Sequence, residues 1–246
     1  FRSKKILHQN LSLALPNIDK AKQNEIIKKM WINYGKIFSE YMFIKNFRHD
    51  SKFSKKIMIE NQEELEKIKL QKKPVIFISG HFSNFELMAM HLEKSNINLA
   101  AVYRPLNNKF LNPLMERIRK KYICKKQIKK GISGTKELLK EFKNGTSIAL
   151  MIDQRVSEGI KSELFGQKAL TTTIPAQFIK KFDTAVVPIY IERLIDDTFQ
   201  LKILNAIKFS KNETTNDITH KLNKILEKMI MSNPDQWIWT HNRWKV

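Results

Sequence analysis

His81 and Glu86 are the residues of this chain best suited to acid–base chemistry, because they share the short segment ISGHFSNFEL, residues 78–87. A histidine in such a setting removes a proton from a substrate hydroxyl through one ring nitrogen. A nearby carboxylate holds the other ring nitrogen, fixes the tautomer and stabilises the protonated ring. No serine, threonine or cysteine nucleophile is required when the substrate brings its own hydroxyl, so the pair predicts group transfer onto an alcohol.

The pair is predicted to flank a strand-to-helix turn. The apolar run 75–78 is short, β-branched and preceded by Pro74, which predicts a buried strand. Ser83 or Asn84 is expected to cap the helix that follows. A second interpretation stays open, since Ser83-x-x-Glu86 also fits a capping box in which Glu86 only reaches back to the helix N-terminus.

Strand and helix patterns alternate beyond this turn, which predicts an α/β fold with a mostly parallel central sheet flanked by helices. Residues 1–70 are predicted to form an N-terminal helical segment that packs on the core. Residues 71–246 are predicted to form the α/β core with a Trp-rich C-terminal segment, and both parts are expected to make one globular unit. The predicted strands are 75–79, 98–103, 147–152, 185–192 and 199–206. The predicted helices are 19–44, 62–70, 84–93, 108–121, 134–142 and 173–182, followed by helix in the last 30 residues.

Charged residues follow several of these strands. In open α/β sheets, ligands bind beyond the C-terminal ends of the strands. Arg104 follows the second predicted strand, and Asp153 and Arg155 follow the third. Arginine side chains match phosphate groups through paired hydrogen bonds. Each arginine alone is typical of a solvated surface. A base, its carboxylate and two cations at successive strand ends, however, favour a functional site along these strand ends.

The chain carries a formal net charge of +21 over 246 residues. This charge indicates an anionic partner, either nucleic acid or an acidic membrane surface, although several lysine clusters also fit ordinary solvated faces. No helix-turn-helix, zinc-finger or aromatic RNA-binding signature accompanies the lysines, which favours the membrane over nucleic acid. The single Cys124 excludes a disulfide framework and a cysteine zinc site, and it indicates a reducing compartment.

No stretch of the sequence approaches the roughly 20 apolar residues of a transmembrane helix. The first residue is Phe1, so we expect the sequence to start inside a longer gene product, whose upstream part has room for a membrane anchor. Trp237, Trp239 and Trp244 lie within eight positions of one another. This tryptophan cluster suits a bilayer interface or a cavity wall, and it equally suits ordinary docking of a C-terminal segment on the core.

The motifs, in their order along the chain, resemble those of the lipid A biosynthesis acyltransferases, which belong to the lysophospholipid-acyltransferase-like superfamily. The matching segments span nearly the whole chain: GHFSNFE (80–86) for the family's His-x-x-x-x-Asp/Glu motif, YRP (103–105), NG (144–145), DQR (153–155), LFG (164–166), TTT (171–173) and QWIWTHNRWK (236–245). Leu164 replaces a common phenylalanine and Ile174-Pro175 follows the threonines. These departures leave the acyl chain length open.

The resemblance implies transfer of a fatty acyl group from acyl carrier protein to a hydroxyl of a Kdo-bearing lipid A precursor. It also implies a place on the cytoplasmic face of the bacterial inner membrane, usually through an N-terminal anchor. The resemblance implies no metal and no bound cofactor, because acyl-acyl carrier protein is the donor substrate. Nucleic acid is not an expected partner.

The same resemblance assigns expected roles to the site residues. His81 is the base and Glu86 orients it, while backbone amides near Ser83 bind the oxyanion. Arg104 and Arg155 hold the acceptor phosphate or sugar acid, and Asp153 orients them. The remaining residues expected at the substrate, at the helix N-terminus or along an acyl slot, are Ser83, Asn84, Phe82, Phe85 and Phe165.

Two other functions remain open at this stage. A related acyltransferase acting on a lysophospholipid or another glycolipid would keep the His81 and Glu86 pair and change the acceptor. A non-catalytic basic protein that binds membrane or nucleic acid would keep the charge without the pair.

Overall fold

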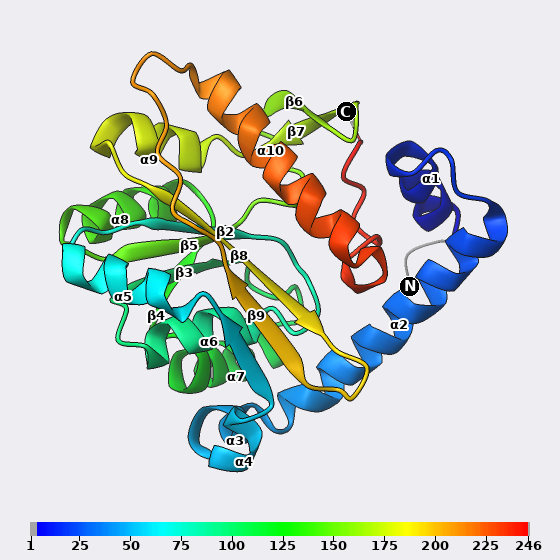
Figure 1. Cartoon of the computed structure of the whole chain (residues 1–246), viewed down its shortest axis with the longest axis horizontal. Helices are drawn as coiled ribbons and strands as arrows, with labels where there is room; N and C mark the ends of the chain where they lie inside the picture. Colours follow the sequence, from blue (N-terminus) through cyan, green and yellow to red (C-terminus); the bar gives the residue numbers. More distant parts are fainter. Residues whose placement is uncertain (1–3, 246) are drawn as a thin grey trace.

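The computed structural model of the protein describes residues 4–245 and is built around a seven-stranded sheet (Figure 1). The strand order is β1-β9-β8-β2-β5-β3-β4. In chain order these strands are β1 (Ile57–Glu60), β2 (Ile76–Ser79), β3 (Leu99–Tyr103), β4 (Lys126–Lys129), β5 (Ser147–Met151), β8 (Val186–Arg193) and β9 (Phe199–Ile203). A separate antiparallel hairpin is formed by β6 (Ile160–Leu164) and β7 (Gln167–Thr171).

The sheet is mostly parallel, as predicted. Strands β8, β2, β5, β3 and β4 run in one direction, whereas β9 is antiparallel to β8 and β1 is parallel to β9. All four residues of the central strand β2 are buried. A continuous apolar run of this kind is expected where helices cover both faces of a parallel sheet.

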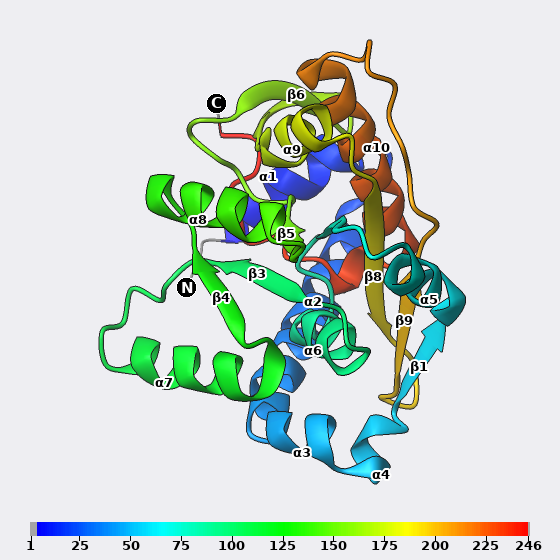
Figure 2. The same ribbon diagram turned by 90° about the vertical axis from the view of Figure 1, so that its left-hand side faces the viewer.

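Helices lie on both faces of the sheet. Figures 1 and 2 place α6 and α7 on one face and α8, α9 and α10 on the other. Right-handed crossovers explain this division, because the chain moves toward one edge through α6 and α7 and returns through α8 and α9. These helices are α6 (Glu86–Lys94), α7 (Leu111–Ile118), α8 (Ile132–Lys143), α9 (Ile174–Phe182) and α10 (Thr215–Ser232).

The N-terminal helices α1 (Lys4–Ala14) and α2 (Lys20–Tyr41) lie beyond the end of the sheet toward which β8 points (Figure 1). Asp19 caps α2 by accepting a hydrogen bond from the amide of Lys22. Asn10 of α1 donates to the backbone oxygens of Trp239 and His241, at 2.8 and 2.9 Å. The N-terminal helix and the C-terminal segment are therefore hydrogen-bonded to each other at this end of the sheet.

The other short elements are α3 (Ile44–His49), α4 (Ser51–Ser54), α5 (Gln62–Gln71), a π-helical turn (Arg119–Ile123) and a 3₁₀ turn (Pro234–Gln236). The five predicted strands correspond to β2, β3, β5, β8 and β9, while β1, β4 and the hairpin were not predicted. The segment 1–70 is thus not wholly helical, because β1 lies within it. The predicted C-terminal helix is also too long: α10 ends before Pro234, which has no N–H to continue a helix.

The tryptophan cluster belongs to the core. Trp237, Trp239 and Trp244 are all buried, so of the alternatives left open for them the structure shows docking of the C-terminal segment on the core and not a bilayer interface. The rings of Trp237 and Trp239 pack edge to face at 4.7 Å, and the indole N–H of Trp244 donates to the backbone oxygen of Leu164 at 3.1 Å. Within residues 4–245, no helix is both long and apolar enough to cross a membrane.

Candidate active site

His81 and Asp153 are brought together by the register of two neighbouring strands. Strand β2 pairs with β5 so that Ser79 lies opposite Met151, and the pairing continues when the amide of Ile152 donates to Ser79 at 2.9 Å. Two residues further along each chain, His81 Nδ1 lies 2.8 Å from Oδ1 of Asp153. The amide of His81 also donates to Oδ2 of Asp153 at 2.8 Å. The register of β2 and β5 therefore places a His–Asp pair just beyond the C-terminal ends of these strands.

Asp153 is fully buried and surrounded by hydrogen-bond donors. Besides the two groups of His81, the indole N–H of Trp237 donates to its Oδ2 at 2.9 Å. Trp237 reaches this position because it forms a β-bridge with Phe82 in the turn after β2. Burial alone would raise the pKa of Asp153, but the charge of His81 and these donors lower it to about 2. Asp153 is therefore an ionised carboxylate at neutral pH.

The imidazole of His81 has the features of a general base. One fifth of its side chain is exposed, and the ring lies edge-on to Phe85 at 4.8 Å. Because Asp153 takes Nδ1, Nε2 is the nitrogen left for a substrate proton. Burial opposes protonation, but the Asp153 carboxylate outweighs it and raises the pKa of His81 above its ordinary value.

Glu86, which was expected to orient His81, is bound by other residues. Its Oε1 accepts hydrogen bonds from the hydroxyl of Tyr41 and from Nε and Nη2 of Arg119, the last two at 2.8 and 2.6 Å. The orienting contact predicted for Glu86 is made by Asp153, because the strand register sets that carboxylate against the ring. The charge of Glu86 still contributes to raising the pKa of His81.

The capping box that competed with the catalytic interpretation is absent. The hydroxyl of Ser83 is buried without a hydrogen-bond partner in the described part of the chain, so it does not cap α6. Helix α6 begins at Glu86 itself. Its N-cap position is Phe85, whose side chain has no group that can accept a hydrogen bond. Glu86 therefore serves the contact with Tyr41 and Arg119 rather than the helix end.

We expect Glu86→Ala to destabilise the protein by about 3–5 kcal/mol, because it leaves the largely buried guanidinium of Arg119 without its carboxylate. Urea unfolding followed by circular dichroism measures the change. The double variant Glu86→Ala/Arg119→Ala should recover part of the loss, since it removes both charges. Glu25→Ala is the matched control, because Glu25 forms exposed ion pairs with Lys22 and Lys29. Equal stability of the Glu86 and Glu25 variants would contradict this account.

The turn between His81 and α6 is strained. Ser83 has a φ of 40°, a left-handed conformation that is uncommon for serine. The hydroxyl of Ser83 and Oδ1 of Asn84 are both buried without partners among the described residues, while Nδ2 of Asn84 donates to Glu40 at 2.9 Å. Unpaired buried groups cost about 1–3 kcal/mol each. Strain of this kind is typical of active-site turns.

Several residues predicted to face the substrate have other roles here. Phe82 is completely buried and packs edge-on to Tyr190 at 5.0 Å, so it belongs to the core and does not line an open acyl slot. Ser83 and Asn84 are likewise buried. The amide of Ser83 donates to the backbone oxygen of Gln236 at 3.0 Å, so it is not free for an oxyanion. The half-buried Phe165 lies at the hairpin turn, with its ring 6.5 Å from that of Trp244.

The two predicted arginines differ in their surroundings. Arg104 is exposed directly after β3, and burial together with the nearby charge of Arg104 lowers the pKa of Lys130. Arg155 is half-buried and donates from Nε to the backbone oxygen of Lys245 at 2.6 Å. The prediction that Asp153 orients these arginines is wrong, since Asp153 is occupied by His81 and Trp237.

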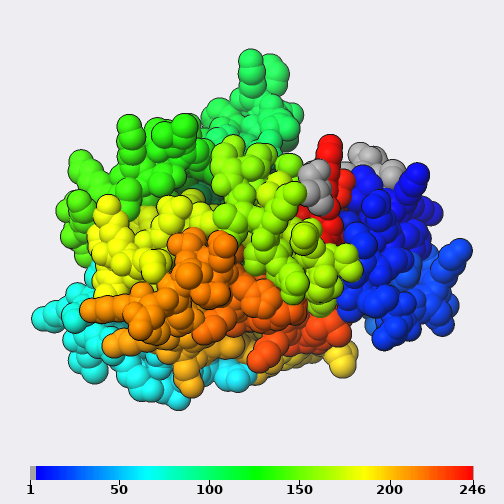
Figure 3. All heavy atoms as spheres, turned by 90° about the horizontal axis from the view of Figure 1, so that it is seen from above, coloured from blue at the N-terminus to red at the C-terminus, as the bar shows by residue number. Residues whose placement is uncertain are grey.

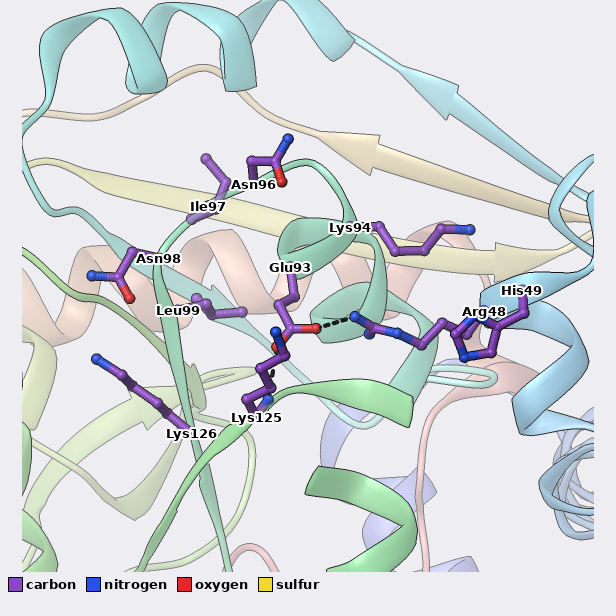
Figure 4. Close-up of a pocket in the computed structure, with 10 residues that line it drawn as sticks. All are labelled: Arg48, His49, Glu93, Lys94, Asn96, Ile97, Asn98, Leu99, Lys125 and Lys126. Atoms are coloured by element: carbon purple, nitrogen blue, oxygen red, sulfur yellow. Dashed lines mark hydrogen bonds and ion pairs between the residues drawn. The ribbon is translucent and has the colours of Figure 1, made fainter. Parts of the chain in front are cut away.

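A cavity of about 510 Å³ lies elsewhere, near the starts of β3 and β4 (Figure 4). Across it, Arg48 reaches Glu93, whose carboxylate also accepts the amide of Lys125 at 2.8 Å. None of the predicted site residues lines this cavity. It is therefore separate from the His81 site, which occupies the other ends of the strands. Within residues 4–245, no group of three His, Cys, Asp or Glu side chains is placed to hold a metal ion.

Three contributors to the site were not predicted in these roles. Tyr41 belongs to the apolar face of α2 and gave no separate signal. Arg119 lies in a run of basic residues, RIRKK, in which nothing singles it out. Trp237 was predicted only as one of a cluster of tryptophans, although its indole N–H donates to the Asp153 carboxylate. All three are recognisable only when distant elements are placed side by side.

Comparison with known proteins gives a consistent result. The family model described as bacterial lipid A biosynthesis acyltransferase matches residues 1–246. A lipid A biosynthesis lauroyltransferase of Escherichia coli (strain K12) is 24% identical over 255 residues, covering 100% of this chain and 80% of the relative. A lipid A biosynthesis palmitoleoyltransferase of the same organism is 23% identical over 251 residues, covering 100% and 79%.

Among solved structures, a 1-acyl-sn-glycerophosphate acyltransferase from Thermotoga maritima aligns with a TM-score of 0.44 and 14% identity. The alignment covers 95% of this chain and 91% of that one.

Proposed function

Since the chain belongs to the bacterial lipid A biosynthesis acyltransferase family, we propose that it transfers a fatty acyl group from acyl carrier protein to a hydroxyl of a Kdo-bearing lipid A precursor. The protein is an acyltransferase of lipid A biosynthesis; the donor and the acceptor are the proposed part. We also propose that it works at the cytoplasmic face of the inner membrane. The observation that carries the chemistry is the contact between His81 Nδ1 and the buried carboxylate of Asp153.

In the proposed mechanism, Nε2 of His81 accepts the proton of the acceptor hydroxyl as its oxygen attacks the thioester carbonyl. Asp153 stabilises the imidazolium that forms and keeps Nε2 as the accepting nitrogen. When the tetrahedral intermediate collapses, the carbon–sulfur bond breaks and the thiolate of the carrier arm takes the proton back from His81. The products are the new ester and the free thiol, and His81 is returned to its neutral form.

The oxyanion needs donors close to His81. Because the amide of Ser83 is occupied, we propose the amides of Asn84, Phe85 and Glu86 at the start of α6, for which the described residues provide no acceptor. The positive end of the helix dipole favours negative charge at this place. In this proposal Glu86 holds Arg119 near the base, and the guanidinium of Arg119 adds positive charge beside the developing oxyanion.

The direct test is acyl transfer from radiolabelled acyl carrier protein to a set of acceptors. We expect transfer to a Kdo-bearing lipid A precursor, and a panel of donor lengths then defines the acyl chain. Transfer only to a lysophospholipid or to another glycolipid would replace the acceptor in this proposal and keep its chemistry. No transfer to any acceptor by the folded protein would contradict the proposed function.

We expect Arg104→Ala to raise the KM for the acceptor by about 10- to 100-fold and to leave the KM for the donor nearly unchanged. The expected size follows from one charge-assisted hydrogen bond to a phosphate, roughly 1.5–3 kcal/mol. Arg104 is exposed, so the fold should be unaffected. Arg155→Ala should act in the same direction but also release the C-terminal segment that its guanidinium binds.

Steady-state kinetics with each substrate varied separately checks this prediction. Lys73→Ala is the control, because Lys73 is an exposed cation before the start of β2, at the other end of the strands. An effect of Arg104→Ala confined to the carrier-protein donor would contradict the acceptor assignment.

A further inference from the structure

Helix α7 and the loop before it expose an unusual amount of apolar surface. The helix contains no buried residue, although it is amphipathic in sequence. Phe110 is 93% exposed, and Leu111 and Leu114 are 52% and 53% exposed, beside the exposed Leu106. Large apolar side chains grouped in this way on a soluble surface usually mark an interaction site. None of these four side chains packs against the hydrophobic core.

This segment also projects from the molecule. In Figure 2 the connection from β3 to α7 forms the outermost loop on its side of the fold. In Figure 3 the atoms coloured for this part of the sequence stand out above the neighbouring surface. A projecting apolar tip can insert into a lipid bilayer, whereas binding to a folded protein generally requires a broad complementary surface.

The charges around the tip are predominantly positive. Between residues 104 and 121 the sequence RPLNNKFLNPLMERIRKK contains six basic residues and a single acidic one. The acidic residue, Glu116, is engaged by Asn112 at 2.8 Å and by Lys129 at 3.6 Å. Arg104, Lys109, Arg117 and Lys120 are exposed. Apolar side chains with basic residues beside them match the boundary between acyl chains and anionic headgroups.

We propose that residues 106–114, the apolar tip of the β3–α7 loop and α7, insert into the surface of an anionic lipid bilayer while the surrounding basic residues bind its headgroups. This inference rests on the proposed function for its lipid acceptor, but it concerns how the protein reaches that acceptor. Helix α7 leads directly into the π-helical turn that contains Arg119, and Arg119 binds Glu86 at the start of α6. Insertion of the tip thus places the bilayer surface on the segment that leads to Arg119, whose partner Glu86 begins the helix after the His81 turn.

The test compares the wild-type chain with the triple variant Phe110→Ser/Leu111→Ser/Leu114→Ser in co-sedimentation with vesicles of phosphatidylethanolamine and phosphatidylglycerol. We expect the variant to bind at least about 100-fold more weakly, because three partly inserted apolar side chains are lost. Folding should be retained, since α7 buries none of its residues. Leu70→Ser is the matched control: Leu70 is 81% exposed at the end of α5, far from the tip, and its loss should not alter binding.

A second measurement places a reporter in the tip itself. With Trp31→Phe, the remaining native tryptophans are buried, so the fluorescence of a Phe110→Trp variant should shift to the blue when vesicles are added. No shift, or equal vesicle binding by the triple variant and wild type, would overturn the inference. Normal vesicle binding combined with loss of transfer from acyl carrier protein would assign the surface to the acidic donor instead, and would also overturn it.

Activity assays separate this inference from the proposed function. The triple variant should transfer acyl groups normally to an acceptor dispersed in detergent and poorly to the same acceptor in vesicles. If wild type is inactive in both, the proposed function fails, while the vesicle binding results still decide the membrane contact.

Discussion

The His81→Ala protein is expected to fold normally and to lose acyl transfer by at least about 10²–10⁴-fold. The side chain is the only exposed part of the His81–Asp153 pair, and its Nε2 is the group proposed to take the proton of the acceptor hydroxyl. Single-turnover transfer from labelled acyl carrier protein measures the loss, and thermal unfolding checks the fold. His49→Ala provides the control, because His49 is an exposed histidine beside the separate cavity of Figure 4. Comparable turnover by the His81 variant would rule out His81 as the base.

Asp153→Asn should lower the rate by up to about 10⁴-fold, as expected when an orienting carboxylate is replaced by an amide. The amide stabilises the tautomer whose Nε2 already carries a proton. The pH dependence gives a more specific signature. In the wild type, Asp153 raises the pKa of His81, so activity is lost when the pH falls through that raised value. Removing the charge lowers the pKa of His81, and the acidic limb of the variant should therefore move to lower pH.

The dependence of kcat/KM on pH checks this expectation, with Glu86→Gln as the comparison. Glu86 also raises the pKa of His81, but less strongly than Asp153 does, so its variant should show the smaller shift. A larger shift for Glu86→Gln than for Asp153→Asn would return the orienting role to Glu86. An unshifted limb in both variants would mean that the titrating group is not His81.

The sequence predicted the elements that carry the site because their patterns are local. The run 75–78 and the run 147–152 are short, apolar and bounded by turn residues, and both are strands of the central sheet. Strands β1 and β4 are edge strands of four residues with alternating or mostly exposed side chains, so they gave no such signal. The β6–β7 hairpin was not predicted, because its turn residue Phe165 adopts a positive φ, and a phenylalanine in the sequence does not indicate that conformation.

The site was predicted less completely, for a physical reason. Glu86 is a neighbour of His81 in sequence, and a local pattern therefore suggested it as the orienting group. Asp153 is a neighbour only through the register of β2 and β5, and single-sequence reasoning does not fix which strands adjoin. Its importance at the strand end was predicted, but its partner was not. The contacts of Tyr41 and Trp237 depend in the same way on elements at opposite ends of the chain.

The bond from Trp237 to Asp153 has a consequence for the order in which the protein matures. All seven strands of the sheet precede Trp237 in the chain, so during synthesis every strand is made before this indole. At roughly 5–20 residues per second, that interval lasts seconds. During it, the strands and His81 have been synthesised, but the Asp153 carboxylate lacks the indole donor and the turn at Ser83 lacks the carbonyl of Gln236. A product shortened before residue 236 would lack the three buried tryptophans as well as these two hydrogen bonds, so we expect it to have neither a complete core nor an assembled His81 site.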